Sequence, residues 1–173
     1  MDKEPSQLAD EGKAAFAAGR FAEAAEFFQQ AANGFTLGRD GLNAAEMGNN
    51  RSVALLKAGK AQAAFESALG TDKVFEGAAD IKRQAMALGN QGAALEALKR
   101  IDEALELYER SADLFAKSGK RDMQSMVLKT IAGIRLRQGR LDEAGINMLG
   151  SLGAAEKPTL TQRFMRFLLR FKP

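Results

Sequence analysis

Residues 85–119, AMALGNQGAALEALKRIDEALELYERSADLFAKSG, have the pattern of two amphipathic helices joined by a tight turn. Apolar residues recur at helical spacing on both sides of residues 99–100, which gives each helix one apolar face. A single helix pair cannot bury both faces, so the unit requires similar units stacked against it. The stretch therefore predicts an all-α protein built from repeats.

Sequences that match this unit less closely lie on both sides of it, at a constant spacing along the chain. The turn recurs as Gly19-Arg20, Gly59-Lys60, Lys99-Arg100 and Gly139-Arg140. Three further sets keep the same period: alanines after the turn, small residues in the helix before it, and aromatic residues ending the helix after it. In that order they are Ala24, Ala64, Ala104 and Ala144; Gly12, Ser52, Gly92 and Ala132; and Phe35, Phe75 and Phe115. Small side chains let two helices approach closely, and the aromatic ring fills the gap to the next unit.

These residues resemble the tetratricopeptide repeat, in a form of about 40 residues rather than the common length of about 34. Gly92 matches the family's small residue in the first helix, and Ala104 matches its small residue early in the second helix. Tyr108 matches its aromatic residue one turn later. HEAT and armadillo repeats are of similar length but lack these paired small residues.

The resemblance covers residues 6–153, with one weak match. GRFAEAAEFFQQA and GRLDEAGINMLGS carry the motif with Phe28 and Met148 in the aromatic position. Ala68 occupies that position in the second repeat, so we expect this repeat to pack differently.

The resemblance implies a right-handed superhelical solenoid of antiparallel helix pairs, with four repeats and a terminal helix. Residues 1–156 would form the repeat domain and residues 157–173 a basic amphipathic C-terminal helix. Ser6 and Asp80 are suited to cap helices. The expected helices are residues 6–18, 21–35, 42–58, 61–75, 80–98, 101–118, 122–138, 141–152 and 161–171.

Composition narrows the functional classes. The chain contains no cysteine and no histidine, which excludes disulfides, Cys-His and Ser-His-Asp catalysis, and zinc sites with cysteine or histidine ligands. The paired acids Asp102-Glu103 and Asp142-Glu143 begin second helices, where their negative charge interacts favourably with the positive end of the helix dipole. We therefore predict no catalytic, cofactor-binding or metal-binding residues. An enzyme would need a convergent polar cluster that the sequence does not show.

Charge is distributed unevenly along the chain. Five basic residues and no acid follow Glu156, so subtracting them from the net charge of +3 leaves −2 for residues 1–156. This near-neutral body argues against a nucleic-acid-binding face. The N-terminus, MDKEPSQLADEG, lacks the apolar segment of a secretory signal, and no apolar run approaches the length of a membrane-spanning helix. These features predict a cytoplasmic location.

In the resembled family, the first helix of each repeat lines a concave groove that holds a peptide or a partner helix. Asparagines in such a groove can bond an extended backbone, methionines adapt to apolar shapes, and lysines pair with acidic groups. The alternative is that these are ordinary solvated positions. Position by position, the resemblance implies a groove formed by Lys13, Phe16, Asn49, Asn50, Val53, Lys57, Met86, Asn90, Glu96, Met126, Lys129 and Arg137.

Three other patterns have simpler explanations. A variant of the family holds acidic C-termini in a two-carboxylate clamp; Asn50 matches it, but Ala9 and Met86 replace two of its basic residues. The basic residue at each turn, such as Arg100, favours the helix dipole, although a basic edge for an acidic partner is the alternative. The GNQG segment at residues 89–92 lies inside a helix and lacks the context of a phosphate loop.

The C-terminal stretch TQRFMRFLLRFKP has an apolar stripe beside three arginines. Repeat arrays need a terminal helix with a polar outer face, so a cap is the first interpretation. Docking on an anionic membrane surface or on a partner is the alternative. The residues concerned are Arg163, Phe164, Arg166, Phe167, Arg170 and Phe171. The predicted function is therefore a non-catalytic protein-interaction module, with a peripheral membrane adaptor as the alternative.

Overall fold

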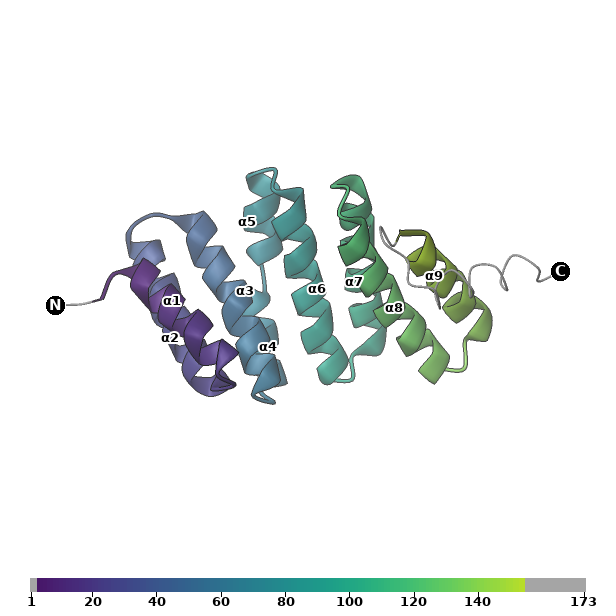
Figure 1. The fold of residues 1–173 in the computed structure, drawn as a ribbon, viewed down its shortest axis with the longest axis horizontal. Coiled ribbons are helices and arrows are strands. Elements are labelled where there is room, and N and C mark those ends of the chain that lie inside the picture. The colour runs from purple at the N-terminus through teal and green to yellow at the C-terminus, as the bar shows by residue number, and fades with distance from the viewer. Residues whose placement is uncertain (1–2, 155–173) are drawn as a thin grey trace.

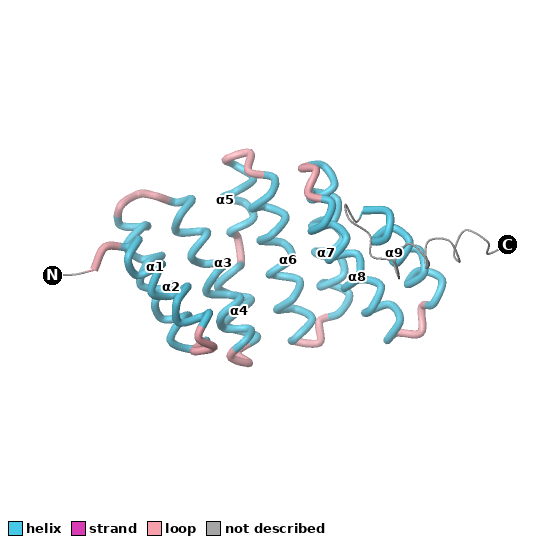
Figure 2. Tube along the Cα trace, viewed as in Figure 1, coloured by secondary structure: helices cyan, strands magenta, loops and turns pink. Residues whose placement is uncertain are grey.

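The computed structural model describes residues 3–154, and every regular element in this range is a helix (Figures 1 and 2). The predicted all-α repeat solenoid is confirmed. The predicted helix at residues 161–171 lies outside the described residues. The helices are α1 (Pro5–Ala17), α2 (Phe21–Leu37), α3 (Gly41–Lys57), α4 (Ala61–Ala68), α5 (Thr71–Gly77), α6 (Ile81–Ala97), α7 (Ile101–Lys117), α8 (Arg121–Arg137) and α9 (Leu141–Ala154).

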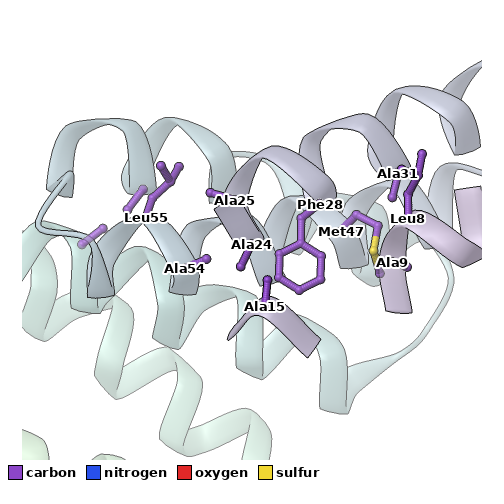
Figure 3. Close-up of a cluster of buried hydrophobic side chains, with 12 residues drawn as sticks. Leu8, Ala9, Ala15, Ala24, Ala25, Phe28, Ala31, Met47, Ala54 and Leu55 are labelled. Atoms are coloured by element: carbon purple, nitrogen blue, oxygen red, sulfur yellow. The ribbon is translucent and has the colours of Figure 1, made fainter. Parts of the chain in front are cut away.

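The helices follow one another along the long axis of the molecule, with α1 and α9 at opposite ends (Figure 1). Apart from α4 and α5, successive helices pack against each other. The helices α4 and α5 each pack against both α3 and α6, which also contact one another. We call α1, α3, α6 and α8 the first helices, and α2, α4, α5, α7 and α9 the second helices. The apolar core lies between neighbouring helices of the two sets. Figure 3 shows part of it, with the Phe28 ring among alanines such as Ala15 and Ala24.

One type of turn joins the helices, and it recurs at even spacing along the chain. Residues 19, 39, 59, 79, 99, 119 and 139 all have positive φ angles. At the first turn, Gly19 donates its N–H to the Phe16 carbonyl (3.0 Å) and Arg20 donates to the Ala15 carbonyl (2.9 Å). This pair of bonds satisfies carbonyls that the helix end would leave unpaired. The four turns recognised in the sequence, at residues 19, 59, 99 and 139, lie inside repeats, whereas the turns at residues 39, 79 and 119 join one repeat to the next.

Small residues on first helices contact aromatic rings on second helices, as the repeated pattern predicted. A Cβ atom added to Gly12 would lie 2.7 Å from the Phe28 ring, and one added to Gly92 would lie 3.1 Å from the Tyr108 ring. Such distances leave no room for a side chain. In the second repeat the corresponding residues are Ser52 and Ala68, so a larger residue on one helix accompanies a smaller one on the other.

The second repeat differs from the others at its second helix. The single helix predicted for residues 61–75 is wrong: the chain breaks between α4 and α5, where Gly70 adopts the left-handed conformation (φ 79°) that glycine tolerates best. The Ala68 carbonyl accepts hydrogen bonds from Thr71 Oγ1 (2.7 Å) and Gln91 Nε2 (3.1 Å). Gln91 Nε2 also donates to the buried Asp72 (2.8 Å). The expected difference in packing is thus confirmed.

Helix caps agree with the prediction at one of two positions. Asp80 accepts a hydrogen bond from the Arg83 backbone N–H (2.9 Å) and caps α6 as predicted. Ser6 is not a cap. Glu4 occupies the cap position of α1, and Pro5 is the first helical residue, where its missing N–H costs no hydrogen bond.

Close contact at the small positions predicts a stability effect. Gly92→Leu and Ala104→Leu should each lower the free energy of unfolding by about 1–3 kcal/mol, because the added methylenes force the helices apart. Gly92 faces the Tyr108 ring, and Ala104 is fully buried. Urea denaturation measures the effect, with Ala97→Leu on the exposed side of α6 as the control. Unchanged midpoints for both buried substitutions would contradict the packing described here.

Candidate functional site

Three hollows run along the first helices and share lining residues, so they form a single groove. Their volumes are about 360, 430 and 520 Å³. Asn50 and Val53 line both the first and the second, while Met86 and Asn90 line both the second and the third. We call this surface the first-helix groove. It extends from α1 to α8, with second-helix residues such as Phe28 and Tyr108 at its floor.

Most of the residues that the sequence suggested for a groove lie along this one. Those that line it are Lys13, Phe16, Asn49, Asn50, Val53, Met86, Asn90, Met126 and Lys129. Lys57, Glu96 and Arg137 line none of the three hollows, because each lies at the end of its helix. Arg137 instead donates to Glu96 Oε1 (2.7 Å) and so ties α8 to α6. A role of these three residues in binding stays a prediction.

The asparagines of the groove differ in whether their side-chain amides already have hydrogen-bond partners within the protein. Asn49 is buried, and its Oδ1 accepts a bond from Asn90 Nδ2 (3.2 Å). This bond connects α3 with α6. Asn50 makes no side-chain hydrogen bond within residues 3–154, so its donors and acceptor are available to a ligand.

Arg83 neutralises the acidic side chains in the middle of the groove. Its Nε donates to Asp80 (2.6 Å), its Nη1 donates to Glu46 (3.1 Å), and its guanidinium lies 5.0 Å from the centre of the Phe75 ring. The pKa of Asp80 lies below its usual value of 3.8, mainly because the Arg83 backbone N–H donates a hydrogen bond to the carboxylate. Burial raises this pKa, and the Arg83 guanidinium lowers it further. Arg83 therefore links α3 and α6. Together with Lys82, which lines the same hollow, it balances the two carboxylates of this section.

The section between α6 and α8 is the most apolar part of the groove. Met86, Met123 and Met126 line it, and the Met86 and Met126 side chains are 40% and 67% exposed. At its floor, Tyr108 donates its hydroxyl to Glu96 Oε2 (3.0 Å). Burial, together with the charge of Glu96, raises the pKa of Tyr108, so this hydroxyl keeps its proton. Lys129 provides the one charged side chain that lines this hollow.

The sequence profile of the tetratricopeptide repeat family matches residues 83–145. Residues 83–145 belong to this family. No curated protein is similar enough to the chain to be matched. The match begins in α6 and ends in α9, so it covers the third repeat and the start of the fourth. Tetratricopeptide repeats are generally protein–protein interaction modules, and this chain carries such a module.

The repeat period reveals groove residues that the sequence analysis missed. Thr130 lies one repeat after Asn90 and lines the groove beside α8. Glu46 lies one repeat before Met86 and also lines the groove. Stepping along the chain in tetratricopeptide repeat units would have found both. Arg83 and Met123 are likewise one unit apart, but nothing in the sequence indicates that Arg83 is held by two carboxylates.

Among residues 3–154, no group of three or more Asp and Glu side chains is placed to hold a metal ion. None of the helices in this range is both long and apolar enough to cross a lipid bilayer.

The cap of α6 predicts a dependence of stability on pH. The folded pKa of Asp80 is lowered, so its charge contributes stability that is present above the unfolded pKa and is lost as the pH falls through the folded value. Asp80→Asn keeps a capping side chain but removes the charge. In thermal melts the variant should unfold at a lower temperature than the wild type at pH 7. This difference in melting temperature should disappear below about pH 4. A difference in melting temperature that stayed constant from pH 7 to pH 3 would contradict a role for the charge.

Proposed function

We propose that the chain is a non-catalytic interaction module that binds a peptide or a partner helix in the first-helix groove. The observation that supports this most strongly is the continuity of the groove. Neighbouring hollows share residues of α3 and α6, and together the three hollows reach from α1 to α8, so one extended segment could contact several repeats at once. The general role of tetratricopeptide repeats agrees with this use of the surface.

Two kinds of side chain would do the binding. Asn50 and Asn90 occupy equivalent positions in neighbouring repeats. Their amides can donate to and accept from the main chain of an extended segment, which gives affinity without reading its sequence. Met86, Met123 and Met126 offer flexible apolar contacts that adapt to a partner's side chains.

The proposal predicts that binding depends on groove amides. Peptides selected from a random displayed library should bind at least about tenfold more weakly to a protein carrying Asn50→Ala and Asn90→Ala, as expected for two lost hydrogen bonds. The matched control is Gln30→Ala with Gln62→Ala, two exposed amides on second helices. Fluorescence anisotropy measures the affinities, and thermal melts show whether each variant is folded. Equal losses for both pairs would contradict groove binding.

Residues 157–173 raise a second question, which is whether they cover the array or attach it to a membrane. Leu141, Ile146 and Leu149 on α9 are 64%, 67% and 41% exposed in the described residues. A following apolar segment could bury them, and each buried large side chain contributes about 1.5–3 kcal/mol. We infer that the C-terminal segment covers this end of the array. The alternative is a peripheral adaptor whose arginines, at about 1 kcal/mol each, hold it to an anionic membrane.

Deletion of residues 159–173 distinguishes the two roles. If the segment covers the array, its deletion should lower the free energy of unfolding by at least about 2 kcal/mol or cause aggregation, because the apolar side chains of α9 become exposed. Urea denaturation and light scattering measure these changes. An unchanged unfolding curve, together with lost binding to vesicles that contain anionic lipid, would contradict the cover and favour the membrane adaptor.

A further inference from the structure

The two sets of helices carry opposite charge. The first helices α1, α3, α6 and α8 have nine basic and five acidic side chains, a net charge of +4. The second helices have three basic and twelve acidic side chains, a net charge of −9. The overall charge of +3 conceals this division. A charged partner would therefore experience very different fields on the two faces.

Within the groove, the charges that remain without an ion pair are basic. The carboxylates of Glu46 and Asp80, which line the groove, pair with Arg83. By contrast, the ammonium groups of Lys82, Lys120 and Lys129 form no hydrogen bond or ion pair among residues 3–154, and all three are exposed. These three ammonium groups are thus the ones in this region that acidic side chains of a partner can pair with.

These lysines surround the apolar section between α6 and α8. Lys129 lines the hollow of about 520 Å³ together with Met86, Met123 and Met126. Lys82 and Lys120 line an adjoining hollow that shares Met123 with it. Arg121 and Asp122 line this hollow as well, so its three basic residues and one acidic residue give a net charge of +2. An apolar surface with a basic rim therefore lies at this end of the groove. Its volume falls in the range of about 300–1,000 Å³ that holds drug-sized molecules, so more than one side chain of a partner has room.

We propose that this section of the groove binds an acidic protein segment that inserts large apolar side chains between Met86 and Met126. The inference rests on the groove function proposed above and adds the chemistry of the partner. Lys82, Lys120 and Lys129 attract the acidic side chains, and the methionines accept the apolar ones. The acidic second helices repel the same segment, which directs it to the first-helix face.

The test uses three synthetic peptides of about 20 residues, which as helices span roughly 30 Å. The first has leucines along one helical face and glutamates elsewhere. In the second, lysines replace the glutamates; in the third, serines replace the leucines. We expect the acidic leucine peptide to bind the full-length protein at least about tenfold more tightly than either of the others at low ionic strength. Its advantage over the lysine peptide should shrink as salt screens the charges.

Variants then locate the binding. Lys82→Glu with Lys129→Glu should weaken binding of the acidic leucine peptide by about tenfold or more, as expected for two reversed charges. The matched control is Arg110→Glu with Lys117→Glu, which makes the same charge change on α7 and should have little effect. Met86→Ser with Met126→Ser should weaken the leucine peptides and leave the serine peptide unchanged.

The outcomes separate the two proposals. If the lysine peptide binds as tightly as the acidic one and loses affinity with the methionine substitutions, the preference for acid is wrong while groove binding stands. If the acidic peptide binds equally to the wild type and to both groove variants, it binds elsewhere and both proposals are contradicted. Equal affinity for the leucine and serine peptides would show recognition of charge alone and would overturn the proposed apolar insertion.

Discussion

The residue in the left-handed conformation at each turn sets the geometry on which the rest of the structure depends. Five of the helices have 17 residues, and each is followed by a turn that places a positive φ at the same distance from the helix end. Equal helices and equal turns bring equivalent positions of every repeat to the same face. The groove follows from this regularity, because Asn50 and Asn90, or Met86 and Met126, are one repeat apart. Where glycine is missing, at Arg39, Ala79 and Lys99, the backbone holds the conformation at a cost of roughly 1 kcal/mol each.

Packing between the two helices of a repeat explains why the small residue on the first helix and the aromatic residue on the second change together from one repeat to the next. Gly12 and Gly92 accept the rings of Phe28 and Tyr108, and no Cβ atom fits there without displacing them. In the second repeat Ala68 takes the place of the ring, and Gly70 breaks the helix after it. Thr71 and Gln91 then satisfy the carbonyl that the break exposes. The irregular repeat therefore keeps its hydrogen bonds although it loses its aromatic contact.

The fold could be predicted from the sequence because its signals are local and repeated. Period, small residues and turn glycines indicated the helix pairs and most helix ends to within about two residues. The break at Gly70 was missed, because one glycine in a helical pattern does not by itself stop a helix. For the groove, helical phase was sufficient for residues such as Asn50 and Met126. Lys57 and Arg137, at the ends of α3 and α8, line none of the three hollows, and their role in binding stays a prediction. Ion pairs between repeats, such as Arg83 with Glu46, depend on side-chain conformation that no spacing reveals.

Opposite charge on the two sets of helices distinguishes the two faces of the molecule, and the methionines allow the proposed binding face to be observed directly. Met86, Met123 and Met126 line the groove, whereas Met47 is buried in the core and Met148 lies on α9. NMR spectra of methyl-labelled methionine, recorded while a selected peptide is added, test the central claim that the first helices form the binding surface. The account predicts that the signals of Met86, Met123 and Met126 shift while those of Met47 and Met148 stay in place. Shifts confined to Met148, with the three groove methionines unchanged, would contradict it.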